Sequence, residues 1–183
     1  MTITILNHPF IEHKLTIMRK RETGTKEFRQ NLDEIAMLMA YEVTKSLPTK
    51  NINIETPLCS MTGKELIRPI VLIPILRAGL GMVDGFKAII PTAKVGHIGM
   101  KRNEETLEPE EYYAKFPSCL TESDVIIVDP MLATGGSSSA AITNIKKRTI
   151  QKICSLHRGL CYPGFWCCVH ESKRPGCFTG IIC

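Results

Sequence analysis

The chain has 183 residues, of which 44% are hydrophobic and 22% are charged, so it is long enough to bury the core of one domain. Its formal net charge of +5 suits an anionic substrate or a nucleic acid, although a solvated surface gives the same balance more often. Asn7, His8 and Pro9 interrupt the opening apolar run, which excludes a signal-peptide core or a membrane span there. We therefore expect a cytoplasmic protein without a membrane partner.

Two amphipathic helices are predicted near the N-terminus. The apolar side chains of residues 8–20 recur at helical spacing and indicate a short helix. A longer stripe begins at Thr25, a residue type suited to the N-cap, and is stopped by Pro48. The stripe consists of Phe28, Leu32, Ile35, Met39, Val43 and Leu47. Such stripes are usually core positions, so we assign these side chains to packing.

Two short apolar runs are predicted to be parallel strands that are buried on both faces. Residues 69–76 form the first run, and the strand is expected to end near Pro74 because proline cannot donate to the ladder. A helical segment over residues 82–90 and an extended run over 94–100 follow, which suggests a crossover between parallel strands. The second run, Asp124–Val128, is continuous and rich in β-branched residues.

The segment between these runs is predicted to be a mobile loop. Residues 101–117 carry many charged side chains around Tyr112 and Tyr113, with Pro109 among them and no sustained period. A loop of this kind can exclude water from a reaction by closing over it. We therefore expect it to act as a lid.

The most informative stretch, residues 125–139, reads VIIVDPMLATGGSSS. It places Asp129 at the end of a buried strand, Gly135 and Gly136 in a loop, and hydroxyl side chains at the start of a helix predicted over residues 137–147. Backbone amides at a helix N-terminus and along a glycine-rich turn bind phosphate, while a neighbouring carboxylate accepts hydrogen bonds from sugar hydroxyls. The stretch thus predicts a ribose 5-phosphate site, although a loop of this kind standing alone is often only a turn.

A second strand end supports the site. Arg77, Ala78 and Gly79 follow the other buried strand, so a cation and a flexible turn occur where ligands of open α/β sheets gather. Arg102 adds a further cation in the predicted mobile loop.

The run VDPMLATGGS, with the upstream LIPILRAGLGM and the N-terminal FRQNLDEIAMLMAYE, resembles the uracil phosphoribosyltransferases over about residues 1–147. Many phosphoribosyltransferases carry two adjacent acids before this loop, whereas here Asp129 is followed by Pro130, as in the uracil enzymes. The resemblance implies the type I phosphoribosyltransferase fold, an α/β protein with an open, mostly parallel sheet and flanking helices.

The resemblance also implies an activity and its partners. The activity is UMP salvage, in which uracil and phosphoribosyl diphosphate give UMP and diphosphate. The expected cofactor is Mg²⁺, held mainly by the substrate and not by a cluster of protein ligands. GTP is a family effector, homo-oligomers are usual in the family, and no nucleic-acid partner is expected.

Individual roles follow from the same resemblance. Asp129 would bind the ribose hydroxyls, the loop over residues 133–137 would surround the 5-phosphate, and Arg77 would meet the diphosphate, with Arg102 reaching it from the mobile loop. Arg77 and Asp129 would be the catalytic residues. The full set expected to bind phosphoribosyl diphosphate is Arg77, Ala78, Gly79, Arg102, Asp129, Pro130, Met131, Leu132, Ala133, Thr134, Gly135, Gly136 and Ser137.

The resemblance stops near residue 147, which divides the chain into an incomplete phosphoribosyltransferase domain, 1–147, and a cysteine-rich tail, 148–183, expected to be poorly ordered. Six of the eight cysteines lie in this tail, which shows no alternation long enough for a strand. The family's C-terminal strands and its uracil-binding segment are expected to be missing or replaced, so the uracil-binding residues stay unassigned.

Three interpretations of the tail are open. A metal site could use the ligand types at Cys161, Cys167, Cys168, His170 and Cys177, but no CxxC pair is present. A disulfide module conflicts with a cytoplasmic setting. The third interpretation, a segment translated out of frame, is favoured by the abrupt change in composition. Two alternatives to an active transferase are therefore an inactive truncated product and a nucleotide-sensing, RNA-binding regulator on the same fold.

Overall fold

The computed structural model describes residues 2–105, 108–131, 135–148, 166–171 and 178–182. Its helices are α1 (Pro9–Arg19), α2 (Thr25–Thr44), α3 (Val83–Ile89) and α4 (Gly136–Arg148), with short 3₁₀ helices η1 (Ala78–Met82) and η2 (Leu120–Glu122). Its strands are β1 (Thr2–Ile5), β2 (Thr49–Glu55), β3 (Ser60–Leu66), β4 (Ile70–Leu76), β5 (Lys94–Val95), β6 (His97–Arg102), β7 (Pro109–Lys115), β8 (Asp124–Val128), β9 (Trp166–Glu171) and β10 (Phe178–Ile182).

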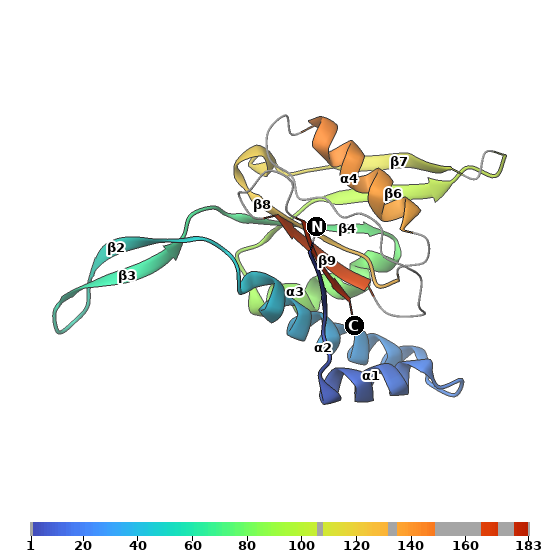
Figure 1. Cartoon of the computed structure of the whole chain (residues 1–183), viewed down its shortest axis with the longest axis horizontal. Coiled ribbons are helices and arrows are strands. Elements are labelled where there is room, and N and C mark those ends of the chain that lie inside the picture. The colour runs from blue at the N-terminus through green and yellow to red at the C-terminus, as the bar shows by residue number, and fades with distance from the viewer. Residues whose placement is uncertain (1, 106–107, 132–134, 149–165, 172–177, 183) are drawn as a thin grey trace.

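Among the described residues, eight strands form one sheet in the order β1-β10-β9-β8-β4-β6-β7, with β5 also paired to β4. The central strand β4 is parallel to β5, β6 and β8, whereas β7 and β9 are antiparallel to their neighbours. Helices α1, α2 and α3 lie on one side of the sheet and α4 lies on the other (Figure 1). The predicted α/β class with flanking helices is confirmed, and the sheet is mixed, with parallel pairs at the centre and a further parallel pair, β1 and β10, at one edge.

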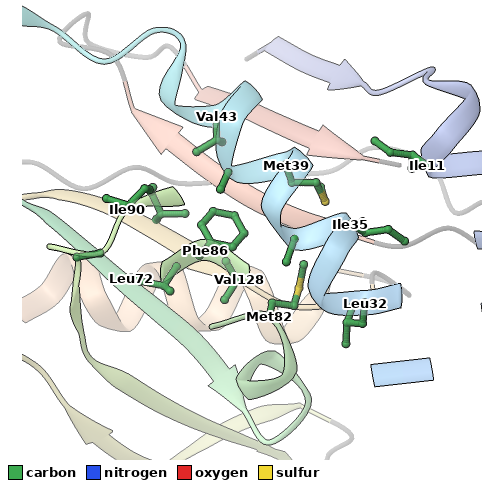
Figure 2. Packing of buried hydrophobic residues seen from close by; sticks show 14 of the residues in the cluster. Ile11, Leu32, Ile35, Met39, Val43, Leu72, Met82, Phe86, Ile90 and Val128 are labelled. Carbon is green, nitrogen blue, oxygen red and sulfur yellow. The ribbon is translucent and has the colours of Figure 1, made fainter. Parts of the chain in front are cut away.

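Both faces of the two central strands are buried, as their continuous apolar sequences predict. Ile70 and Leu72 of β4 pack into a cluster with α1, α2 and α3, whereas Val71 and Ile73 face α4. Figure 2 shows the ring of Phe86 at the centre of the first cluster, between α2 and the sheet. Alternate residues of a strand point to opposite faces, so a strand covered on both sides needs no polar position.

The strand β4 continues through Pro74 and ends at Leu76, near the position where it was predicted to end. The carbonyl of Leu72 in β4 accepts a hydrogen bond from the Gly96 amide, on the side of β4 where β5 and β6 lie. Residues two apart present their backbone groups to the same side of a parallel strand, so the nitrogen of Pro74 faces that side too. On that side β4 pairs with β5 up to Leu72 and with β6 from Ile75 onward. Pro74 lies between the two pairings, so the N–H that it lacks falls in the gap between β5 and β6.

The predicted crossover and both N-terminal helices are confirmed, but the loop predicted over residues 101–117 is largely a strand. Residues 109–115 form β7, which pairs antiparallel with β6. The pairing shifts between Gly99, opposite Tyr113, and Met100, opposite Glu111, so Tyr112 is an extra residue in β7. A bulge of this kind interrupts the two-residue period, which is why the sequence shows no strand pattern there.

The prediction that the tail contributes no strand is wrong. β9 pairs with β8 at Ile127 and Val169, and β10 lies between β9 and the N-terminal strand β1. β8 therefore has a neighbouring strand on the side away from β4. The sequence of β9 begins with the unbroken apolar run WCCV, which lacks the alternation that was sought.

Other predictions about the tail concern parts outside the described residues. The metal interpretation rests on the side chains of Cys161, Cys167, Cys168, His170 and Cys177, and the disulfide interpretation on those of the six tail cysteines. All of these side chains lie outside the description. In the part of the chain that is described, no helix has both the length and the hydropathy needed to cross a membrane.

Candidate functional site

The two strand ends that the sequence singled out meet at one edge of the sheet. β4 and β8 are parallel and in register from Ile70 opposite Asp124 to Pro74 opposite Val128. Asp129 follows the end of β8, and Arg77 follows the end of β4 after a cis peptide bond to Leu76. Parallel strands end at a common edge, so the acid and the cation are delivered to the same place.

Gly79 explains how closely the turn after β4 approaches β8. A Cβ atom at this position would lie 2.6 Å from the Val128 carbonyl oxygen and 3.1 Å from Cα of Pro74. Only a residue without a side chain leaves room for that contact. The turn that begins with Arg77 is therefore pressed against the strand that ends in Asp129.

Replacing Gly79 with alanine is expected to destabilise the fold by about 1–3 kcal/mol, because backbone atoms on both sides must move. The same displacement should weaken binding of phosphoribosyl diphosphate through Arg77. Urea unfolding and calorimetry would measure the two effects. Gly81→Ala is the matched control in the same turn, because its new Cβ would meet only the flexible end of Leu32, at 2.9 Å.

Asp129 has an altered ionisation at this edge. Burial raises the pKa of its carboxyl from 3.8 to about 6, and a hydrogen bond from the Met131 amide, 3.4 Å from Oδ1, offsets part of that rise. A carboxylate without a cationic partner at hand is costly to bury. A ligand that donates hydrogen bonds, such as a sugar diol, would relieve this cost.

The first turn of α4 supplies backbone donors next to the acid. Gly135 has a positive φ of 74°, in the region that glycine adopts without strain, and its carbonyl accepts the first helical hydrogen bond from Ser139 at 2.9 Å. The amides of Gly136, Ser137 and Ser138 precede that bond and have no carbonyl of the helix to bind. Amides of this kind are able to bind an anion, and the 5-phosphate site predicted here stays a prediction. The predicted ligands Leu132, Ala133 and Thr134 lie outside the described residues.

A cavity of about 1090 Å³ opens beside this edge. Four of the predicted residues line it, namely Arg77, Ala78, Pro130 and Met131. The remaining described site residues, Gly79, Arg102, Asp129 and Gly135–Ser137, are not part of its lining. The structure thus places the turn that begins with Arg77 and the residues after Asp129 around one space.

The rest of the cavity lining, which the sequence did not predict, comes from α1, α2, η1 and α3. It is formed by Arg19, Thr25, Phe28, Arg29, Gln30, Leu32, Asp33, Leu80, Gly81 and Asp84. Phe28 was assigned to packing, but its side chain is 37% exposed and lines the cavity. The sequence signal for this exposure was the position of Phe28 in the first turn of a long helix, because an apolar stripe can extend beyond the sheet that the helix covers.

The charge of one acid in the cavity lining acts on another acid. Burial, and then the charge of Asp84, raise the pKa of Asp33, while the nearby Gly85 amide lowers it. Oδ1 of Asp33 is the buried side-chain atom for which the described residues provide no hydrogen-bond partner. The cavity wall therefore has acceptor as well as cationic character.

Arg102 occupies the last position of β6 and is exposed. β6 pairs with β4 at Gly99, opposite Leu76. Arg102 follows Gly99 in β6, so it lies about 10 Å further along the strand direction than the end of β4, which Arg77 follows. Its partner in β7 is Pro109. Arg102 thus projects beyond the sheet edge on a hairpin and not on the irregular loop that was predicted.

Comparisons with known proteins agree with this geometry. The family model described as uracil phosphoribosyltransferase matches residues 5–158. A uracil phosphoribosyltransferase from Lactobacillus gasseri is 60% identical over 151 residues, covering 82% of this chain and 72% of that protein. Uracil phosphoribosyltransferases from Exiguobacterium sp. and Desulfitobacterium hafniense are 55% and 54% identical, each over 82% of this chain and 73% of their own length.

The solved structure of a protein from Aquifex aeolicus has a TM-score of 0.73 and 39% sequence identity, over 81% of this chain and 71% of that one. The sequence match, the common fold and the strand-end site all point the same way. The chain belongs to the uracil phosphoribosyltransferase family.

Proposed function

We propose that this chain binds phosphoribosyl diphosphate at the edge formed by β4, β8 and α4 and transfers its ribose 5-phosphate to uracil, giving UMP and diphosphate. The observation that carries the proposal is the position of Asp129. Its half-buried carboxylate follows β8 directly, with the Gly79 turn packed against that strand and the first turn of α4 next along the chain. The acid, the cation and the helix amides thus lie at one edge of the sheet, as a ligand with a ribose, a diphosphate and a 5-phosphate requires.

The reaction exchanges one bond for another at C1 of the ribose. The bond from C1 to the diphosphate oxygen breaks, uracil N1 bonds to C1, and the N1 proton is released. Positive charge grows on the ribose and negative charge on the leaving group, so Arg77 stabilises the diphosphate as it departs. Asp129, ionised above about pH 6, accepts hydrogen bonds from the ribose hydroxyls and fixes C1 in place.

Mg²⁺ is part of the proposal as an ion that arrives with the substrate. The described residues contain no group of three or more His, Cys, Asp or Glu side chains able to hold a metal ion. Asp129 provides a carboxylate oxygen at the sheet edge, the type of donor that Mg²⁺ prefers. When bound, the ion would neutralise charge on the diphosphate.

Three properties expected of the family remain proposals for this chain: a cytoplasmic location, GTP as an effector and assembly into a homo-oligomer. The β2–β3 hairpin supports the last, because it extends away from the body of the molecule (Figure 1) and exposes Ile54, Leu58 and Met61. An RNA-binding role is not favoured, since the curated relatives are uracil phosphoribosyltransferases. A salt-dependent gel shift with RNA would test it.

The transferase proposal is tested by following labelled uracil into UMP in the presence of phosphoribosyl diphosphate and Mg²⁺. UMP formation should require all three components and should be lost in Arg77→Ala, with the Lactobacillus gasseri relative as the positive control. A chain that binds phosphoribosyl diphosphate but forms no UMP on prolonged incubation would contradict the transfer step. A chain that does not bind it would contradict the whole proposal.

A further inference from the structure

Glu111 of β7 is joined to α4 by an ion pair with Arg148. The Arg148 guanidinium donates to Oε2 at 2.7 Å and to Oε1 at 2.5 Å, a two-pronged pairing. The Glu111 side chain is only 17% exposed, and the Arg148 guanidinium lies 5.9 Å from the centre of the Phe116 ring. The hydrogen bond from Arg148 is the main cause that lowers the pKa of Glu111, and Asn144 of α4 contributes another hydrogen bond.

This contact connects two elements that carry opposite ends of the proposed substrate site. The first turn of α4 holds the amides that would bind the 5-phosphate, and β6 ends at Arg102, which would reach the diphosphate. Glu111 lies opposite Met100, and Pro109 lies opposite Arg102, so the contact is about 7 Å from Arg102 along the hairpin. Figure 1 shows α4 lying along β6 and β7, with the hairpin continuing past the helix.

Because of the bulge in β7, the β6–β7 hairpin needs the contact between Glu111 and α4 to have a defined direction. Tyr112 is the extra residue at the point where the β6–β7 register shifts, and its ring covers Gly99, whose Cβ, if present, would lie 2.6 Å from the Tyr112 ring. Bulges bend and twist a strand pair, so the direction of a hairpin beyond one depends on what holds it there. Glu111 is the residue immediately beyond this bulge on the side of Arg102.

We propose that Glu111 is a positioning residue that holds Arg102 at the diphosphate by fixing the β6–β7 hairpin to α4 through Arg148 and Asn144. This inference rests on the proposed function. It concerns how one half of the site is aligned with the other, because the same helix that binds the 5-phosphate also sets the direction of the hairpin. A misplacement of about 1 Å is enough to lose a large part of such an interaction.

The matched control is Glu110, the preceding residue on β7. Its carboxylate pairs with Lys101 of the same hairpin at 3.2 Å, and both side chains are more than half exposed. Such a pair contributes little and does not tie the hairpin to α4. Glu110→Gln removes the same charge from the same strand, so it separates the effect of charge near the diphosphate from the effect of the contact with the helix.

The test is calorimetric binding of two ligands to the full chain and its variants. Phosphoribosyl diphosphate needs both the 5-phosphate site and Arg102, whereas ribose 5-phosphate carries no diphosphate for Arg102 to bind. Glu111→Gln should weaken phosphoribosyl diphosphate about tenfold and leave ribose 5-phosphate within about twofold. Glu110→Gln should change neither beyond about twofold. In an Arg102→Ala background, Glu111→Gln should have no further effect on either ligand.

Two results would overturn the inference. Equal weakening of both ligands by Glu111→Gln would show a general loss of structure, and additive effects of Glu111→Gln and Arg102→Ala would show that Glu111 does not act through Arg102. A parent chain that binds neither ligand would instead contradict the proposed function, and this inference with it. Binding readouts keep the test independent of turnover.

Discussion

Asp129→Asn is expected to weaken phosphoribosyl diphosphate at least about tenfold while making the free protein more stable. The loss of affinity follows because a charged acceptor of the ribose hydroxyls becomes a neutral amide. The gain in stability follows because burial raises the pKa of the carboxyl to about 6, and the described residues give the carboxylate no cationic partner. Asparagine retains an oxygen for the Met131 amide and removes the charge.

The pH dependence of the stability gain has a definite sign. An acid whose pKa is higher in the folded state does not lower the free energy of unfolding at pH values below its unfolded pKa. Its full lowering of that free energy is reached above its folded pKa. For Asp129 this window runs from 3.8 to about 6, and the shift corresponds to at most about 3 kcal/mol, less whatever solvent at the edge screens. The advantage of Asp129→Asn should therefore grow across that window and stay constant above it.

Urea unfolding at several pH values, together with calorimetry of phosphoribosyl diphosphate, would measure both effects. Asp124→Asn is the contrasting control at the other end of β8, because Asp124 lies 3.6 Å from its ion-pair partner Arg68. That variant should lose stability and keep its affinity for the ligand. If Asp129→Asn were less stable than the parent near neutral pH, the carboxylate would have a stabilising partner that our account omits.

The largest change in rate is expected from the C-terminal segment. The family match ends at residue 158, and the curated relatives are matched over 72–73% of their length. A chimera in which residues 159–183 are replaced by the C-terminal segment of the Lactobacillus gasseri relative should form UMP about a hundredfold faster or more. The reason is that transfer needs uracil held in line with C1, and misalignment alone can cost that much.

Steady-state formation of UMP by the parent and the chimera would measure this effect, with the chimera carrying Asp129→Asn as the inactive control. Equal rates for parent and chimera would mean that uracil is held by residues already present in the chain. The hypothesis that the tail is translated out of frame stays a prediction. Reading the gene across codon 147 in all three frames tests it directly.

Much of the site could be predicted because its signals are local in the sequence. Asp129, the glycines after it and Arg77 each follow a strand whose apolar run is unmistakable, and parallel strands end at one edge. The extent of β8 was predicted to the residue. The start of α4 was predicted to within one residue, because hydroxyl and glycine residues mark a helix N-terminus.

The remaining features depend on tertiary contacts that no local pattern reports. β7 was missed because the bulge at Tyr112 breaks its alternation, and β4 runs through Pro74 only because two neighbouring strands leave a gap there. The β2–β3 hairpin was not assigned, since exposure on both faces gives a strand no hydrophobic period. Phe28 of α2 was assigned to the core, because exposure in the first turn of that helix is set by the position of the sheet.

The central claim is that phosphoribosyl diphosphate binds where β4, β8 and α4 meet, and a crystal structure of the chain with that ligand and Mg²⁺ tests it most directly. Our account predicts ribose hydroxyls within hydrogen-bond distance of Asp129, the 5-phosphate at the amides of Gly136–Ser138, and the diphosphate beside Arg77. A ligand bound elsewhere, for example against Phe28 and Arg29 on the far wall of the cavity with Asp129 uncontacted, would contradict the account.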